Sequence, residues 1–120
     1  MRIAAVLGQD GDNIVPLPDG PVVVILDTDR GTVEEYPNPG MGLAAGRRLA
    51  TTNFLIGQRV DAVCTVPETF CSTSCEVASQ GGIKFIRLAA GVKFSAVAAA
   101  PDQFLRNMAE ELPPEELFKK

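Results

Sequence analysis

The stretch VDAVCTVPETFCSTSCEVASQGGIKFIRL, residues 60–88, carries the strongest fold signal in the chain. Its two apolar runs, 60–66 and 83–88, are typical of buried strands. Between them, a proline that suits a helix start and two glycines that suit a helix end predict a helix over 67–80. A strand, a helix and a second strand joined in this way form a parallel pair with a right-handed crossover. The stretch therefore predicts an α/β fold.

The part of the chain before this stretch predicts a meander followed by a helix. Apolar runs at 2–8 and 21–28 are typical of buried strands, and the rough alternation in 32–36 is typical of a more exposed one. The short turn between the last two runs predicts a hairpin. Small and apolar residues at three- and four-residue steps predict a helix over 41–58. The expected buried face of that helix is Leu43, Gly46, Ala50, Phe54 and Gly57.

The end of the chain has a weaker pattern. Residues 89–100 are compatible with a loop, an extended piece or the start of a helix, and apolar residues four apart predict a helix over 101–112. Two prolines end that helix, so residues 113–120 are expected to be a tail that frays. The complete order is β-β-β-α-β-α-β-α. It predicts one α/β domain over 1–112, with a mixed five-stranded sheet and helices on both faces.

Composition and charge narrow the class of protein. A chain of 120 residues with 46% hydrophobic and 22% charged residues is ordinary for a compact domain. No apolar run approaches the ~18 residues of a membrane span, and the first run is too short for a secretory signal, so a cytoplasmic protein without membrane contact is expected. The net charge of −4, with scattered Lys and Arg, argues against nucleic acid as a partner.

Enzymatic chemistry has little support. The chain has no histidine and no nucleophile motif, which argues against conventional hydrolase mechanisms. A two-metal nuclease needs carboxylates that converge from the strands, and the first strand, RIAAVLG, contains none. Asp27 and Asp29 are better explained as turn formers. A non-catalytic protein is therefore predicted.

The only cysteines, Cys64, Cys71 and Cys75, fall within a dozen residues of one another. Three is an odd number, which fits free thiols or metal ligands better than a disulfide framework. Cys64 is expected near the carboxyl end of a strand, and the other two are expected in the first turns of the next helix, where α/β proteins form ligand crevices. A helix N-terminus also favours the thiolate form that binds metal. These positions predict a metal site.

The alternative is that the same cysteines pack in the core, as free cysteine often does. Helical geometry places Cys71 on the flank and Cys75 at the rim of a buried arc, and Cys64 alternates with buried strand neighbours. The spacing C-x6-C-x3-C is not a standard ferredoxin or zinc pattern, and three thiols leave a tetrahedral metal one ligand short. An incomplete ligand set would still suit a carrier that must release its cargo. Both interpretations stay open.

The segment GMGLAAG is a second candidate site. Gly40, Gly42 and Ala45 satisfy the dinucleotide pattern G-x-G-x-x-[GA], but the strand before them is polar and two prolines interrupt the approach. Glycines at a helix start also leave backbone N–H groups that can bind an anion. Arg87 and Lys93 flank the end of the last strand and are candidate counter-charges. The alternatives are an ordinary turn and solvated surface residues.

Several phrases together resemble the nitrogenase cofactor-carrier family, the dinitrogenase iron–molybdenum cofactor biosynthesis domain. They are RIAAVLGQDGD, VPLPDGPVVVILD, VEEYPNP, GMGLAAG, VDAV and GIKFI, and they cover about residues 1–91. Pro18, Asp19 and Gly20 stand where the family has a loop histidine. The resemblance implies a ribonuclease-H-like fold and non-catalytic binding of a metal–sulfur cluster or its precursor, of the iron–sulfur or iron–molybdenum kind. It also implies a partner protein that donates or accepts the cluster.

Two functions follow from these observations. The first is a cluster carrier, whose predicted site residues are the metal ligands Cys64, Cys71 and Cys75 and the binding residues Gly40, Gly42 and Arg87. The second is a small regulatory or protein-interaction domain of the same fold, in which the cysteines are packing residues. A thiol redox module is a third, less supported possibility, because the chain lacks the C-x-x-C dithiol.

Overall fold

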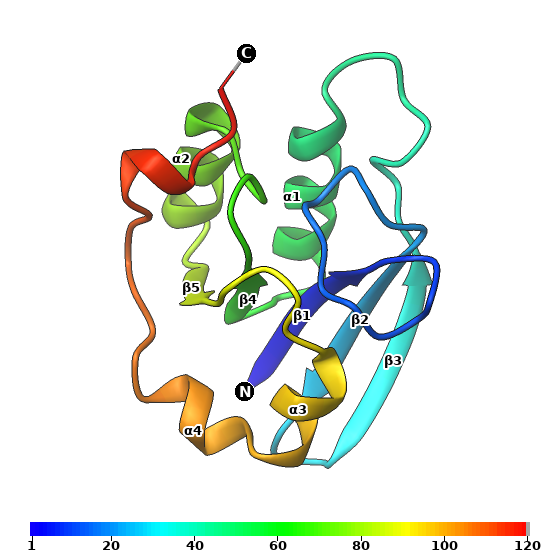
Figure 1. Cartoon of the computed structure of the whole chain (residues 1–120), viewed down its shortest axis with the longest axis vertical. Coiled ribbons are helices and arrows are strands. Elements are labelled where there is room, and N and C mark those ends of the chain that lie inside the picture. The colour runs from blue at the N-terminus through cyan, green and yellow to red at the C-terminus, as the bar shows by residue number, and fades with distance from the viewer. Residues whose placement is uncertain (120) are drawn as a thin grey trace.

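Five strands form one mixed sheet at the centre of the protein, in the order β3-β2-β1-β4-β5 (Figure 1). The computed structural model describes residues 1–119. The strands are β1 (Arg2–Leu7), β2 (Val22–Asp27), β3 (Thr32–Pro37), β4 (Ala62–Thr65) and β5 (Lys84–Arg87). β2 is antiparallel to β1 and β3, whereas β4 is parallel to β1 and β5. The mixed sheet and the hairpin predicted from the sequence are confirmed.

Helices cover both faces of this sheet. They are α1 (Arg47–Gly57), α2 (Ser72–Gln80), α3 (Phe94–Ala99) and α4 (Pro101–Leu105). The two longer helices, α1 and α2, lie side by side on one face, and the two short ones lie on the other (Figure 1). The fold is therefore α/β, with three layers.

Side-chain alternation along the strands produces two separate hydrophobic clusters. On β1, Val6 joins the cluster that contains Leu55 of α1 and Ala78 of α2. The next residue, Leu7, points the opposite way and joins the cluster that contains Phe94 of α3. Consecutive strand residues thus belong to different cores, so two residues close in sequence can lie on opposite sides of the sheet.

α1 begins at Arg47, six residues later than predicted from the sequence. The preceding residues form turns in which Gly42 has a φ of 87° and Gly46 a φ of 68°, values that favour glycine and that a helix does not allow. The predicted buried face is confirmed only in part: Phe54 packs against the core and Ala50 is half-buried, whereas Leu43 is 44% exposed. The buried residues of α1 are Thr51, Thr52 and Leu55.

α2 begins after Cys71, so the predicted start at Pro67 is wrong. A turn intervenes, closed by the Thr69 hydroxyl, which accepts the N–H of Val66 at 2.9 Å and donates to its carbonyl at 2.7 Å. Glu68, within this turn, has a φ of 72°. The turn satisfies backbone groups that an earlier helix would have used, and it makes Cys71 the N-cap. The helix ends at the glycine pair, as predicted.

The helix predicted over 101–112 is wrong beyond Leu105, where α4 ends. The apolar residues four apart do not form one helix face. Met108 packs against the cluster beneath α3, while Leu112 belongs to the cluster beneath α1 and α2. The chain passes around the edge of β5 between these two positions. There, Phe85 and Ala109 exchange two backbone hydrogen bonds of 2.8 Å.

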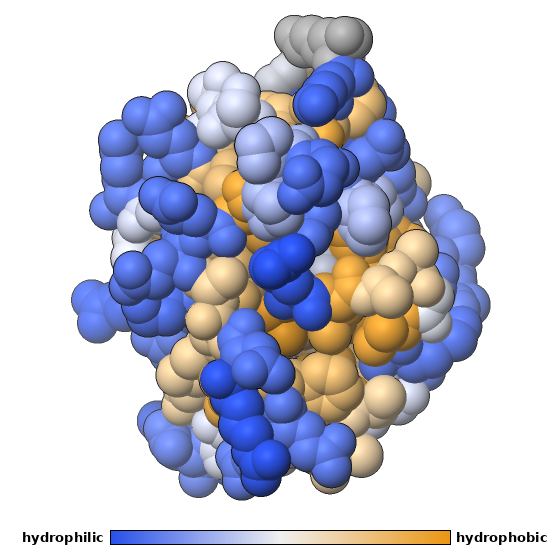
Figure 2. Space-filling view, turned by 60° about the vertical axis from the view of Figure 1, so that its left-hand side comes forward, coloured by the Kyte–Doolittle hydropathy of each residue, from blue (hydrophilic) through white to orange (hydrophobic). Residues whose placement is uncertain are grey.

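The surface on this side of the molecule is mixed in character. Figure 2 brings α2 and the C-terminal segment forward and shows hydrophobic side chains in the middle, interrupted by a column of hydrophilic ones and flanked by further hydrophilic ones on both sides. Phe104 and Leu105 of α4, which pack against the cluster beneath α3, are only half-buried. Among the helices formed by residues 1–119, none combines the length and the apolar character that a membrane span requires.

The C-terminal residues 113–119, called the strap below, pack against the body of the protein. The strap contains a short 3-10 turn at Pro114–Glu116. Its Leu117 packs against the cluster beneath α1 and α2, called the main core below. The fraying expected for a tail over 113–120 is not seen in the described part of the strap, because backbone hydrogen bonds hold it to the turn before α2. Lys120, the last residue of the predicted tail, lies outside the described residues.

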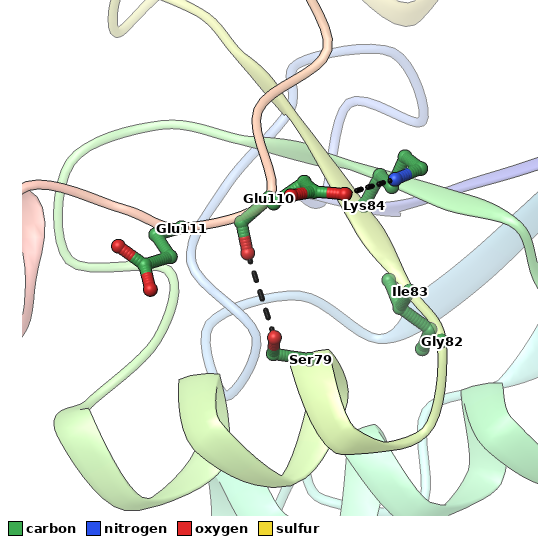
Figure 3. A pocket seen from close by; sticks show the side chains of 6 residues that line it. All are labelled: Ser79, Gly82, Ile83, Lys84, Glu110 and Glu111. Carbon is green, nitrogen blue, oxygen red and sulfur yellow. Dashed lines mark hydrogen bonds and ion pairs between the residues drawn. The ribbon is translucent and has the colours of Figure 1, made fainter.

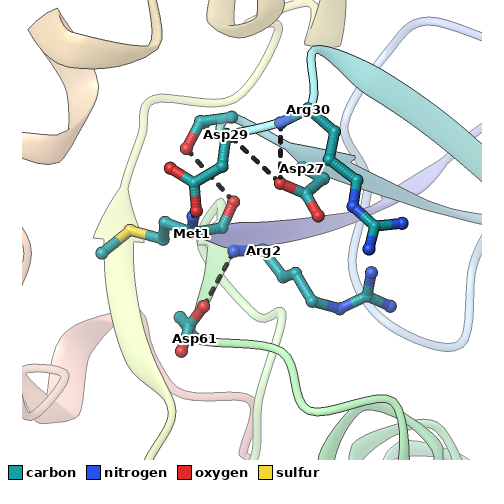
Figure 4. A network of polar contacts seen from close by, with 7 residues as sticks. Met1, Arg2, Asp27, Asp29, Arg30 and Asp61 are labelled. Atoms are coloured by element: carbon teal, nitrogen blue, oxygen red, sulfur yellow. Dashed lines mark hydrogen bonds and ion pairs between the residues drawn. The ribbon is translucent and has the colours of Figure 1, made fainter.

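The acidic turn between β2 and β3 lies at the end of the sheet where β1 begins (Figure 4). The Asp27 carboxylate accepts the N–H groups of Asp29 at 3.0 Å and Arg30 at 3.2 Å. Asp29 in turn pairs with the N-terminal ammonium of Met1 at 2.9 Å. Asp27 therefore closes the turn, as predicted, and Asp29 tethers the N-terminus.

Candidate functional site

The structure places the three cysteines in different surroundings. Cys64 on β4 is 1% exposed and lies in the cluster beneath α3, whereas Cys75 on α2 packs against the cluster on the opposite face of the sheet. Cys71 stands between them in the sequence as the N-cap of α2. No group of three His, Cys, Asp or Glu within residues 1–119 is arranged to hold a metal ion. The three predicted thiol ligands do not come together, because the Cys64 side chain points into the α3 layer whereas α2, with the other two cysteines, lies on the opposite face of the sheet.

Cys71 is half-buried and forms a capping box with Ser74. Its Sγ accepts the Ser74 N–H at 3.5 Å, and its own N–H donates to Ser74 Oγ at 3.0 Å. Burial raises the pKa of the Cys71 thiol, but hydrogen bonds from Ser74 and Thr73 and the positive charge of Arg48 act in the opposite direction and leave this pKa below its ordinary value. The thiolate form is therefore favoured at Cys71.

The pKa values of the other two thiols are raised instead of lowered. Burial raises the pKa of Cys75, and it raises the pKa of the fully enclosed Cys64 to about 12. A thiol that stays protonated is a poor nucleophile and a poor metal ligand. Of the three sequence candidates, only Cys71 combines solvent access with a thiolate-stabilising environment.

Alkylation of the folded protein with iodoacetamide is expected to modify Cys71 first, Cys75 more slowly and Cys64 only after unfolding. The thiolate is the reacting species, so the Cys71 rate should rise with pH around a midpoint below the ordinary thiol value of 9.0. Peptide mass spectrometry over about pH 6 to about pH 10 measures all three rates at once. Similar rates at Cys64 and Cys71 in the native protein would contradict this assignment.

Cys71 lines a cleft of about 890 Å³ between the start of α1, the start of α2 and the strap. In Figure 1 both helix starts and the C-terminal end lie together at the top of the molecule. The helices follow β3 and β4, which are parallel, so the cleft lies where α/β sheets commonly bind ligands. Residues that line it include Arg47, Arg48, Leu49, Cys71, Leu117 and Phe118.

Arg48 connects the three parts of this cleft. From α1, its guanidinium donates to the carbonyl of Glu68 at 2.8 Å and to that of Thr69 at 3.2 Å, both in the turn before α2. The same guanidinium lies over the ring of Phe118 in the strap, 4.0 Å from its centroid. Desolvation lowers the pKa of Arg48, but an arginine remains charged at neutral pH. A fixed positive charge therefore lies at the cleft.

Asn38 positions the start of α1, and the sequence interpretation did not include it. Its buried amide donates to the carbonyls of Leu17 at 2.7 Å and Gly20 at 2.8 Å. Its Oδ1 accepts the Gly40 N–H at 3.1 Å and the Thr51 hydroxyl at 2.7 Å. An asparagine between two prolines after a strand is a turn signal that could have drawn attention to it. Asn38 holds two loops and α1 together on the α1 side of the cleft.

Gly40 and Gly42 do not line the cleft. The N–H of Gly40 is used by Asn38, and a Cβ at Gly40 would lie 2.2 Å from the Arg47 carbonyl oxygen and 2.3 Å from the Thr51 hydroxyl. Gly40 thus allows the loop to approach α1 closely, and its N–H, predicted to bind an anion, is engaged by the Asn38 side chain instead. Gly42 is exposed and serves the turn through its positive φ.

Arg87 is engaged elsewhere. Its Nε donates to both carboxylate oxygens of Glu116 at 3.1 Å, and a further contact joins Nη2 to Oε2. These hydrogen bonds raise the pKa of Arg87. Lys93 pairs with Asp10 at 3.2 Å. The predicted counter-charges are therefore ion-pair partners, and Arg87 anchors the strap.

A smaller hollow of about 320 Å³ lies near the C-terminal end of α2 (Figure 3). Its lysine, Lys84, donates to Glu110 Oε1 at 2.8 Å, and the Ser79 hydroxyl donates to the Glu110 carbonyl at 3.5 Å. These polar groups satisfy one another and include no thiol. The cleft at Cys71 is the better candidate site.

Solved structures of other proteins share this fold, although no family model and no curated protein sequence matches the chain. One is the apo form of the orange protein from Desulfovibrio gigas, with a TM-score of 0.71 and 21% identity over 92% of this chain and 93% of the other. The second is a NifB-like protein from Thermotoga, with a TM-score of 0.64 and 20% identity over 99% and 97% of the two chains. At such identities the likeness concerns the fold, and at that level it confirms the resemblance seen in the sequence.

Proposed function

We propose that this chain binds an anionic metal–sulfur cluster or its precursor in the cleft at Cys71 and carries it without catalysing a reaction. The observation that carries the proposal is the meeting of a thiol of lowered pKa and the fixed charge of Arg48 at one open cleft. Thiolate is the protein ligand that soft metals and iron–sulfur clusters prefer. Positive charge favours an anionic guest.

The donor set fits a guest that arrives already assembled. One thiolate cannot complete the four ligands of a tetrahedral metal, so sulfide or thiolate groups of the guest would supply the others. Arg48, the exposed Arg47 and the first N–H groups of α2 would supply electrostatic attraction. Weak attachment through one protein ligand suits a carrier, because the guest must leave again.

The fold supports the same class of function. The strand order, with β2 antiparallel to the other strands, supports a ribonuclease-H-like arrangement like that of the nitrogenase cofactor carriers. The likeness to an orange protein solved in its apo form and to a NifB-like protein supports a role with a bound metal group, and iron–molybdenum or iron–sulfur clusters are the proposed cargo.

The proposed partner is a protein that donates or accepts the cluster. It would dock on residues 41–49, because Met41, Leu43 and Leu49 are 40%, 44% and 36% exposed and residues 44–49 line the cleft. Apolar side chains gathered on an exposed segment are typical of interaction sites. The same observation favours the alternative function, an interaction domain that binds no cluster.

Anaerobic reconstitution tests the carrier function against this alternative. The protein is mixed with a thiomolybdate or an iron–sulfide anion and desalted, and then retained metal, sulfide and visible absorption are measured. Cys71→Ser is expected to retain about tenfold less metal or lower still, and Arg48→Gln should also retain less. Cys75→Ser is the matched control and should retain as much as the wild type, because Cys75 is one turn away and protonated.

Equal retention by all four proteins would contradict the carrier proposal. If none of them retains metal, the interaction domain becomes the better interpretation. Circular dichroism and unfolding midpoints of each variant show whether any loss of metal reflects loss of structure.

A further inference from the structure

The strap joins the wall of the cleft through a small number of specific contacts. Its backbone lies parallel to the turn before α2, with the Phe118 N–H donating to the Phe70 carbonyl at 2.8 Å. The Glu68 N–H donates to the Glu116 carbonyl at 2.8 Å. These bonds bring the strap directly beside Cys71.

The side chains of the strap are placed on the functional groups of the cleft. The Phe118 ring covers one face of the Arg48 guanidinium at 4.0 Å, and Leu117 and Phe118 line the same cleft as Cys71. A guest that binds Arg48 would compete with Phe118 for this side chain. The strap thus lies against both the thiol and the guanidinium of the cleft.

The strap has few buried residues. Leu112, directly before it, is the last residue of the described chain that is classed as buried, and residues 114, 115 and 119 are exposed. Two prolines, Pro113 and Pro114, separate Leu112 from the segment that contacts the cleft. Segments with few buried contacts open at lower cost than the core unfolds.

The ion pair between Arg87 and Glu116 is the strongest polar side-chain contact of the strap. It is bidentate, and it connects the strap to the end of β5, outside the cleft. The Arg87 side chain is 47% exposed and that of Glu116 22% exposed. Dissolved salt can therefore weaken the pair.

We propose that the strap, residues 113–119, is a gate that opens and closes the cleft, with the Arg87–Glu116 ion pair as its latch. Opening widens the access to Cys71 and frees Arg48 from Phe118, and closing narrows that access and returns the ring to Arg48. That the gate admits and releases a cluster rests on the proposed function. The opening motion does not, so it can be tested without any metal.

The alkylation rate of Cys71 measures the opening. Glu116→Gln is expected to raise the rate about two- to fivefold, because a partly exposed ion pair contributes modestly to closure. Phe118→Ala should raise it on the order of tenfold, since it removes a side chain that lines the same cleft as Cys71 and holds the strap to Arg48. Glu115→Gln, which changes the same charge on the exposed neighbouring residue, is the matched control and should alkylate at the wild-type rate.

Two readouts separate a gate from an altered thiol or a damaged fold. The plateau rate at high pH reports access to Cys71, while the midpoint of the pH profile reports its pKa. Hydrogen exchange should speed up at the amides of Glu68 and Phe118, which bond across the strap, and stay unchanged at the amide of Phe85 in the sheet edge.

Salt provides an independent test of the latch. Raising ionic strength from about 0.05 M to about 0.5 M should increase Cys71 alkylation in the wild type and leave it constant in Glu116→Gln. Equal rates in Glu116→Gln and Glu115→Gln, or a wild-type rate that salt does not change, would show that the strap is a fixed wall. Metal retention with unchanged rates overturns the gate alone, whereas changed rates without metal retention overturn the carrier function alone.

Discussion

Replacing Asn38 by alanine is expected to lower the free energy of unfolding by about 3–4 kcal/mol. The substitution removes the partner of the Leu17 and Gly20 carbonyls and of the Gly40 N–H, and it leaves the Thr51 hydroxyl only its longer contact to the Arg47 carbonyl. Asn38 is buried, so water cannot easily replace it, and each buried polar group that loses its partner costs about 1–3 kcal/mol. Urea unfolding followed by circular dichroism measures the change.

The matched control is Asn53→Ala, an asparagine on the exposed side of α1. It should change the free energy of unfolding by no more than about 0.5 kcal/mol, as surface substitutions usually do. A loss of about 1 kcal/mol or less in Asn38→Ala would mean that the loops rearrange and find other partners. The role of Asn38 in fixing the start of α1 would then be wrong.

Phe70→Ala is expected to lower the free energy of unfolding by about 3–5 kcal/mol, the range for truncating a buried aromatic residue. The Phe70 ring is fully buried and packs edge-on against Phe85, with 5.3 Å between the ring centroids. Phe70 also lies directly before Cys71, and its carbonyl accepts the Phe118 N–H of the strap. Its loss should therefore destabilise both the core and the Cys71 side of the cleft.

Phe104→Ala provides the comparison for Phe70→Ala. Phe104 is half-buried over the other hydrophobic cluster, so its truncation should cost about 1–2 kcal/mol. Chemical denaturation gives both values under the same conditions. Equal losses for the two phenylalanines would contradict the placement of Phe70 at the centre of the main core.

The candidate site shows where sequence patterns lose their predictive value. The sequence places Cys64 at a strand end and Cys71 near a helix start, and both placements are correct in outline. It cannot show that Cys64 faces the α3 layer, because the face of a strand residue depends on which neighbours pair with that strand. The Thr69 turn, which makes Cys71 an N-cap, depends on two hydrogen bonds of one hydroxyl, and these have no periodic signature in the sequence.

The strap illustrates the same limit at longer range. Two prolines mark the end of regular structure, and local composition predicts a free tail. The contacts that hold the strap join Phe118 to Arg48 and Glu116 to Arg87, pairs separated by many residues. Nothing in the sequence near either partner indicates such a pairing.

The sequence alone predicted the strand positions, the hairpin, the helix end at the glycine pair and the α/β class. These features depend on period-two and period-3.6 patterns and on turn residues, which act over a few neighbours. Tertiary packing determines which thiol is accessible, which arginine lies at the cleft and which segment lies against both. Those properties depend on the register of the sheet and on contacts between distant segments, so they exist only once the two layers of helices have closed on the strands.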